Sequence, residues 1–161
     1  MARYAEGTDV SSDRSQAEIQ RVVRSYGAVA YGYGWEDGRA LVTFQCSGRR
    51  IRFVVPLPDP NADRFILTPT GKARTATAAC DSYEQEVRRL WRALALVIKA
   101  MFEAAASGIV TFEEAFLPYT LLPTGRTVAE HALPEVERSY AGQLPAGPGF
   151  LALPPVAGVS P

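Results

Sequence analysis

Residues 28–56, AVAYGYGWEDGRALVTFQCSGRRIRFVVP, decide the fold of this chain of 161 residues. Two turn signals, Asp37-Gly38 and Ser47-Gly48, divide the stretch into three runs with alternating side-chain character. A period of two is typical of strands, and turn dipeptides between such runs favour tight hairpins. The stretch therefore predicts a three-stranded antiparallel meander.

The length of the two turns decides which side chains share a face of the meander. Two-residue turns pair Glu36 with Arg39 and Cys46 with Arg49, and the two registers then agree. One face would carry Tyr31, Tyr33, Trp35, Val42, Phe44, Ile51, Phe53 and Val55, and the other Gly32, Gly34, Leu41, Thr43, Gln45, Arg50, Arg52 and Val54. A longer first turn would shift the register by one residue and exchange the faces. The two-residue turn gathers the large apolar side chains, so we expect the aromatic residues of the first strand to be core.

A long amphipathic helix is expected after the meander, over residues 82–107. Either Ser82 with Gln85 or Asp81 with Glu84 would form a capping box at its start, and Gly108 would end it. Its apolar residues recur at helical spacing. They are Val87, Leu90, Trp91, Leu94, Ile98, Met101, Phe102 and Ala105. We expect this helix to pack on the apolar face of the sheet.

The segments before and after the meander are less regular. Residues 1–10 read as an extended arm, followed by a helix from Ser12 or Asp13 to Tyr26, which Gly27 caps. Residues 57–80 follow a proline-rich strand end and show no clear hydrophobic periodicity. They are expected to contain either a short strand at 65–68 or a mobile functional loop.

Capping-box pairs indicate two short helices nearer the C-terminus. Thr111 and Glu114 open a helix that would end at Pro118, before an expected strand at 119–122 and a turn at 123–125. Thr127 and Glu130 open another, which Pro134 would interrupt or restart and Gly142 would close. Residues 143–161, rich in proline and glycine, are expected to form an extended tail. The prediction is a single α+β domain over residues 1–142: an N-terminal helix, the meander, the long helix and short C-terminal helices.

Composition excludes several classes of protein. The 17 basic and 17 acidic side chains cancel, so any contact with nucleic acid must depend on a local basic patch. The two cysteines, Cys46 and Cys80, are too few for a disulfide framework and are expected to be reduced. No apolar run reaches the roughly 18 residues of a membrane span, and residues 1–6 lack a signal-peptide pattern. We expect a cytoplasmic protein.

Basic side chains are the first candidate functional residues. Arg50 and Arg52 share the polar face of the meander with two glycines, and four more cations lie on the long helix. These are Arg88, Arg89, Arg92 and Lys99. Guanidinium groups suit phosphates because their planar fork donates two hydrogen bonds at once. The alternative is a solvated face whose charges serve solubility. The aromatic residues of the first strand are a second candidate, because exposed rings can form a stacking platform for bases. The predicted register instead places these residues in the core.

Catalytic and metal chemistry have little support in the sequence. His131 is the single histidine, and no nucleophile signature surrounds either cysteine. Metal sites need three or four clustered ligands. The glycines of Tyr31-Gly32-Tyr33-Gly34-Trp35 lack the third glycine and the following helix of a dinucleotide fingerprint. We therefore expect a non-enzymatic protein without a cofactor.

Three segments resemble short proteins of phages and prophages that are described as hypothetical. They are residues 48–59 (GRRIRFVVPLPD), residues 91–100 (WRALALVIKA) and residues 122–128 (LPTGRTV). The resemblance covers most of residues 3–142 and implies a viral or mobile-element setting. The expected topology is also similar to that of phage single-strand annealing proteins, in which a long basic helix backs a three-stranded antiparallel sheet.

Two functions follow as hypotheses. The first is binding of single-stranded DNA or RNA, or of recombination and replication machinery, through Arg50, Arg52, Arg88, Arg89, Arg92 and Lys99. The second is a protein-interaction module, either a virion component or an inhibitor of a host defence protein. Under both, homo-oligomers are plausible because a short meander leaves strand edges to be covered.

Overall fold

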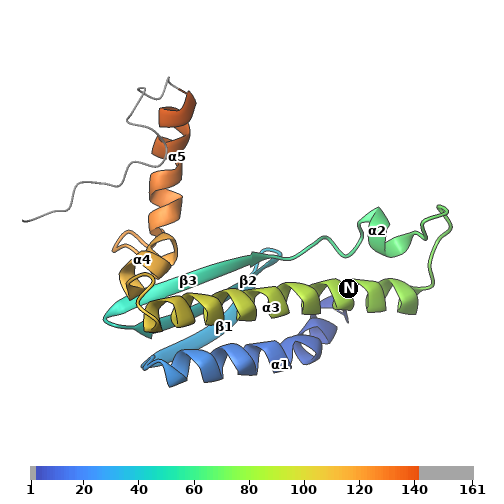
Figure 1. Ribbon diagram of the computed structural model, residues 1–161. Helices are drawn as coiled ribbons and strands as arrows, with labels where there is room; N and C mark the ends of the chain where they lie inside the picture. Colours follow the sequence, from blue (N-terminus) through green and yellow to red (C-terminus); the bar gives the residue numbers. More distant parts are fainter. Residues whose placement is uncertain (1–2, 142–161) are drawn as a thin grey trace, which may run out of the picture.

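The computed structural model describes residues 3–141 of the chain (Figure 1). Its elements in chain order are α1 (Arg3–Ser25), β1 (Ala30–Glu36), β2 (Arg39–Cys46), β3 (Arg49–Pro56), α2 (Asp63–Ile66), α3 (Ala76–Ala106), α4 (Phe112–Phe116), the 3-10 helix η1 (Leu117–Tyr119) and α5 (Val128–Ala141). The predicted α+β class is confirmed. The tail expected at 143–161 lies outside the described residues.

The meander has the predicted order and register. The strands follow one another as β1-β2-β3, with Glu36 opposite Arg39 and Cys46 opposite Arg49. Both hairpins turn on two residues with positive φ, 47° at Asp37 and 70° at Gly38 in the first. Two consecutive positive φ values define the type I′ turn, whose twist matches that of the flanking strands.

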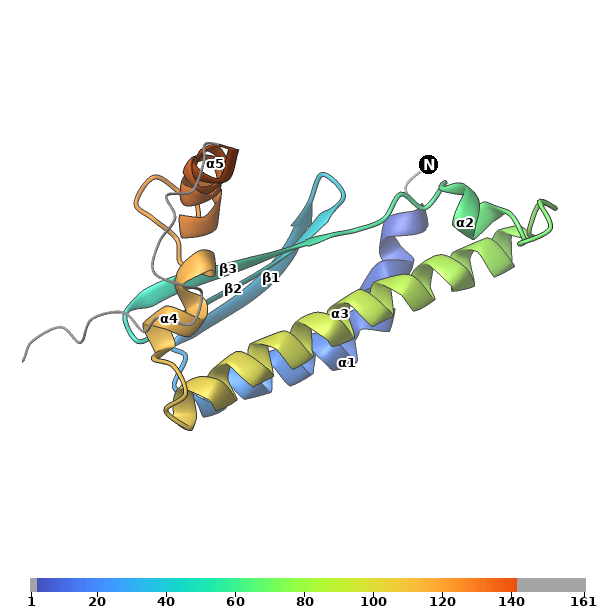
Figure 2. The same cartoon turned by 45° about the horizontal axis from the view of Figure 1, so that its top comes forward.

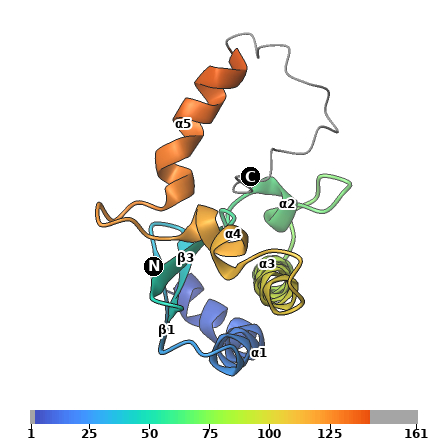
Figure 3. The ribbon, with the colours of Figure 1, turned by 60° about the vertical axis from the view of Figure 1, so that its left-hand side comes forward.

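Helices α1 and α3 lie side by side and cover one face of the sheet (Figures 2 and 3). They run in the same direction, because the Tyr26 ring at the end of α1 stacks on Phe102 near the end of α3, with centroids 4.6 Å apart. The Tyr26 hydroxyl also donates a hydrogen bond of 2.9 Å to Glu103 of α3. The long helix thus packs on the sheet as predicted, with α1 beside it.

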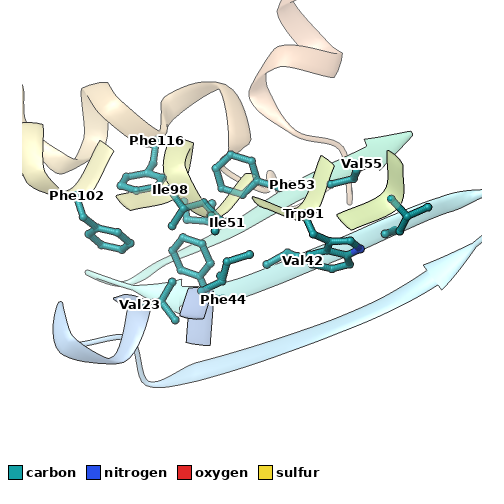
Figure 4. Packing of buried hydrophobic residues seen from close by; sticks show 14 of the residues in the cluster. Val23, Val42, Phe44, Ile51, Phe53, Val55, Trp91, Ile98, Phe102 and Phe116 are labelled. Carbon is teal, nitrogen blue, oxygen red and sulfur yellow. The ribbon is translucent and has the colours of Figure 1, made fainter. Parts of the chain in front are cut away.

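The hydrophobic core lies between the sheet and these two helices (Figure 4). The sheet contributes Ala40, Val42, Phe44, Cys46, Ile51, Phe53 and Val55, and α1 and α3 contribute Ile19, Val23, Val87, Trp91, Ala95, Ile98 and Phe102, while Phe116 of α4 closes one end. Burying large apolar side chains contributes about 1.5–3 kcal/mol each, so this layer dominates the stability of the fold.

The aromatic residues of β1 are less buried than predicted. They share the face of the core, but Tyr33 is 47% exposed and Trp35 is 57% exposed, while Tyr31 is half-buried. The register prediction was right and the burial prediction was wrong for Tyr33 and Trp35. The physical reason is that β1 is an edge strand, and the β1–β2 hairpin rises away from the two helices (Figure 2).

The first helix is longer than the sequence suggested. It begins at Arg3, so the extended arm expected over residues 1–10 is wrong from Arg3 onward. No proline interrupts this segment, and extending a nucleated helix costs little. Its end is as predicted: Gly27 has a φ of 87°, and the amides of Gly27 and Ala28 donate to the carbonyls of Arg24 and Val23. This pair of hydrogen bonds is a Schellman motif.

The long helix begins earlier than expected, at Ala76 rather than residue 82. Thr75 is its N-cap and accepts a hydrogen bond of 3.2 Å from the amide of Ala78. The start was missed because the first turn is alanine-rich and carries no apolar stripe. At about 1.5 Å per residue, its 31 residues span roughly 46 Å. The helix ends before Gly108, as predicted, with a φ of 74° there.

Within 57–80 the chain forms a short helix instead of the strand considered at 65–68. Helix α2 places the buried ring of Phe65 edge-on against Tyr83 of α3, with centroids 5.5 Å apart. A single bridge between Leu67 and Ala73 then closes the loop before α3.

Both predicted C-terminal capping boxes are present, at Thr111 with Glu114 and at Thr127 with Glu130. Thr111 and Glu114 cap α4, which continues as η1 through Pro118. Residues 119–122 form isolated bridges rather than the expected strand, and the turn before Gly125 is confirmed.

Helix α5 continues through Pro134 without a break and stands away from the sheet (Figures 1 and 3). Pro134 has no N–H to donate to the carbonyl of Glu130 four residues earlier. That carbonyl instead accepts a hydrogen bond from the guanidinium of Arg126. The freed acceptor is thereby satisfied, and the interruption predicted at Pro134 does not occur.

Candidate nucleic-acid interface

An open groove of about 680 Å³ runs along the outer side of the first half of α3, flanked by α1 and α2. Helix α1 contributes Arg14, Ser15 and Glu18, α2 contributes Arg64 and Phe65, and α3 contributes Ser82, Gln85, Glu86, Arg88, Arg89 and Arg92. Five arginines thus outnumber two glutamates in the lining. In a chain with no net charge, this is a local concentration of positive charge.

The arginines of α3 line the groove because the apolar face of this helix is turned toward the core. Val87 and Trp91 of α3 lie in the core, so the residues on the opposite side of the helix, including Arg89 and Arg92, face outward. Phe65 anchors α2 against Tyr83. The guanidinium of Arg64 lies over the Phe65 ring, 4.7 Å from its centroid, which fixes that cation at the rim.

Two of the five arginines are paired with carboxylates. Arg89 donates two hydrogen bonds to Glu86, of 2.7 and 2.8 Å, and Arg88 lies 3.9 Å from Glu84. Hydrogen bonding from Arg89 lowers the pKa of Glu86 and raises that of Arg89. Arg14, Arg64 and Arg92 are exposed and form no ion pair within 4 Å among residues 12–141, although the charge of Arg64 also helps to lower the pKa of Glu86. These three are available to an external anion.

Arg50 and Arg52 lie on the other side of the sheet. Arg52 forms an ion pair of 2.8 Å with Glu130, and its side chain is 26% exposed. Glu130 also accepts a hydrogen bond of 2.8 Å from the amide of Thr127, and this bond, ahead of the charge of Arg52, lowers its pKa. Arg52 therefore joins the start of α5 to β3. Arg50 is exposed, and its carbonyl accepts a hydrogen bond from Leu121.

The structure thus divides the six predicted residues. Arg88, Arg89 and Arg92 converge on the groove, Arg50 and Arg52 lie across the sheet, and Lys99 is exposed on α3 beyond the groove lining. A single ligand at the groove would not reach Arg50 or Arg52, because the sheet and core lie between.

Sequence reasoning missed Arg14 and Arg64. Arg14 was seen only as part of an N-terminal helix, and nothing in the sequence indicated that this helix lies parallel to α3. Arg64 belongs to the segment without pattern between β3 and α3. A signal for Arg64 did exist, since an Arg-Phe pair followed by apolar residues is compatible with a short docked helix.

Among the side chains that the structure describes, no group of three His, Cys, Asp or Glu residues lies where it could hold a metal ion. Both cysteines are free; Cys46 is buried, and burial with nearby Glu84 raises the pKa of the Cys80 thiol. His131 is exposed on α5. In the same part of the chain, no helix has the length and apolar character needed to cross a bilayer.

Comparisons of the chain with models of protein families, with curated proteins and with solved structures find no match.

Proposed function

We propose that this chain is a non-enzymatic protein of a phage or mobile element that binds single-stranded nucleic acid at the groove between α1, α2 and α3. One observation carries the proposal: arginines from three separate helices line one open groove in a chain without net charge. Arg14, Arg64 and Arg92 contact phosphates, and Arg88 and Arg89 add to the local field. The phage setting follows from the sequence resemblance.

The lining suits a phosphate backbone more than bases. The one aromatic residue in it, Phe65, is buried and covered by Arg64, so no exposed ring is available for stacking. Contacts to phosphates carry no sequence information. We therefore expect binding that is insensitive to sequence. Helices α1 and α2 flank the groove on both sides, which admits one flexible strand more easily than a rigid duplex.

The test compares two triple variants that remove the same charge. Arg14→Gln, Arg64→Gln and Arg92→Gln together empty the groove of its unpaired cations. Arg39→Gln, Arg49→Gln and Arg50→Gln remove three exposed arginines of the sheet. Fluorescence anisotropy with a labelled oligonucleotide measures the dissociation constant at about 50 mM salt, where phosphate contacts are strongest.

We expect the groove variant to lose most of its affinity and the sheet variant to keep the affinity of the wild type. Equal losses would assign binding to overall charge and contradict the groove. Absence of binding by the wild type at low salt would reject the function. A stronger interaction with duplex than with single strand would change the assigned ligand.

A second candidate, a protein-interaction module, is favoured by one observation. Helix α5 has no buried residue and exposes Leu133, Val136 and Tyr140 at helical spacing. Such a stripe on a helix that stands away from the sheet is typical of a surface for a protein partner. Finding the chain in purified virions, or in a stable complex with a purified host protein, would support this function instead.

A further inference from the structure

The two edges of the sheet differ in whether another segment of the chain bonds to them. The edge at β3 is covered, because Thr120 bridges to Ile51 and the amide of Leu121 donates 2.8 Å to the carbonyl of Arg50. On the outer side of β1, no segment within residues 3–141 forms a strand pairing. An uncovered edge presents unpaired N–H and C=O groups and is a template for another strand.

The register fixes which groups of β1 point outward. In a two-residue hairpin the flanking pair, here Glu36 and Arg39, is hydrogen-bonded, and the pattern alternates along the strand. Gly34 and Gly32 therefore bond to β2, and the backbone groups of Tyr31, Tyr33 and Trp35 face away from it. The same alternation predicts that Arg50 points outward at the other edge, which the bond from Leu121 confirms.

We propose that two copies of this chain pair antiparallel through β1 around a two-fold axis at Tyr33, forming a six-stranded sheet. The sequence of β1, AYGYGWE, is nearly symmetric about that residue. The pairing sets Tyr33 opposite itself and Tyr31 opposite Trp35, all with outward backbone groups. Each of these pairs exchanges two hydrogen bonds. A two-fold interface needs a patch that is complementary to itself, and this strand provides one.

The side chains of β1 fit this partner. Tyr33 and Trp35 lie on the core side of the sheet yet remain about half exposed, and pairing would extend the aromatic face across the axis. The strand has no proline and no lysine, which proteins use to block exposed edges. Its one charged residue, Glu36, would lie opposite Ala30 and meet no like charge.

The glycines of β1 support close approach by a second backbone. A side chain at Gly34 would meet nothing within 4 Å in the single chain, and one at Gly32 would meet only Thr43, at 3.6 Å. Packing inside the chain therefore does not require them, although glycine weakens a strand. In the proposed register Gly32 lies opposite Gly34 in non-hydrogen-bonded pairs, whose Cα atoms approach to about 4.5 Å.

The first experiment measures mass in solution by light scattering during size-exclusion chromatography. We expect the full chain to have twice the mass of one chain, and Tyr33→Pro to have the mass of one. Proline removes an outward N–H and is tolerated at a strand edge. Val54→Pro, at the outer edge of β3, removes an N–H that likewise faces away from β2, so it is the matched control and should stay a dimer. A monomeric wild type, or a dimer that survives Tyr33→Pro in a folded protein, would overturn the proposal.

The second experiment tests the register and does not depend on tolerance of proline. In a Cys80→Ser background, Tyr33→Cys places two thiols opposite each other, with Cα atoms about 5.5 Å apart, within disulfide range. Trp35→Cys places them four residues apart, roughly 13 Å. We expect oxidation to link Tyr33→Cys and not Trp35→Cys, whereas a mixture of Tyr31→Cys and Trp35→Cys should link. Equal linking of Tyr33→Cys and Trp35→Cys would contradict this register. The pairing does not involve the groove, so either proposal can fail alone.

Discussion

Phe116 is fully buried although it belongs to a helix of only five residues. Its ring lies 4.7 to 6.5 Å, between centroids, from four other phenylalanine rings. These are Phe44, Phe53, Phe102 and Phe112. Aromatic pairs at such separations stabilise beyond the area they bury. One side chain therefore joins α4 to the sheet and to α3, and through α4 it positions the segment that covers the β3 edge.

Replacing Phe116 by alanine should lower the free energy of unfolding by about 3–5 kcal/mol, because a buried ring is lost and a cavity remains. The neighbouring residue Leu117, 52% exposed, provides the control. Its replacement by alanine should change stability by no more than about 0.5 kcal/mol. Urea denaturation followed by circular dichroism measures both, and equal effects would show that Phe116 is not a central packing residue.

Glu130 is the second residue whose surroundings make a prediction. Hydrogen bonding from the Thr127 amide, assisted by the charge of Arg52, keeps its pKa below the ordinary value. A carboxyl group with a lowered folded pKa adds stability above its unfolded pKa, about 4.3, and loses it as the pH falls through the folded value. The attachment of α5 to β3 should therefore weaken in acid.

The substitution Glu130→Gln isolates this contribution. The variant should be less stable than the wild type at neutral pH, and the difference should shrink as the pH falls below the pKa of Glu130. Urea denaturation at a series of pH values measures the two free energies. A difference that stays constant into the acid range would show that the ionised carboxylate contributes nothing.

At the scale of elements, the start of α3 shows which helix boundaries local sequence pattern can predict and which it cannot. Residues such as Ser82 and Gln85 have the spacing of a capping box, but three-residue spacing also occurs inside helices. Thr75 is the true N-cap. The alanine-rich first turn has a high helix propensity but no apolar stripe, so periodicity could not reveal it. The start of α3 and the formation of α2 depend on tertiary packing, which sequence periodicity does not show.

Replacing each of the two candidate caps by alanine tests this assignment. Thr75→Ala should cost about 1 kcal/mol, because the amide of Ala78 loses its acceptor. Ser82→Ala, inside the helix, should be neutral or slightly stabilising, since alanine has the higher helix propensity. Thermal denaturation of the two variants gives the comparison. A larger loss at Ser82 would place the start of the stable helix where the sequence pattern suggested.

At the scale of the whole molecule, the sequence predicted the sheet more fully than the surface. The register was accessible because Asp37-Gly38 and Ser47-Gly48 fix turn length and the alternation of residues fixes the faces. The exposure of Trp35 was not accessible, because it depends on how far α1 and α3 cover an edge strand. The groove was half accessible: Arg88, Arg89 and Arg92 share one helix, whereas Arg14 and Arg64 join them only through the packing of α1 and α2.

Zero net charge makes the groove the decisive feature of the molecule. A chain without net charge does not attract nucleic acid over long distances, so the proposed binding depends on a few local cations. The groove does not include Arg50 and Arg52, which lie across the sheet, and the sheet variant tests whether Arg50 takes part in binding.

The most direct measurement is the salt dependence of single-strand binding by the wild type and by the triple variant Arg14→Gln, Arg64→Gln and Arg92→Gln. Each phosphate contact to a single strand contributes about 0.7 to the slope of log K against log salt concentration. We expect the slope of the variant to be shallower than that of the wild type by about 2. Equal slopes for the two proteins would contradict phosphate binding at this groove.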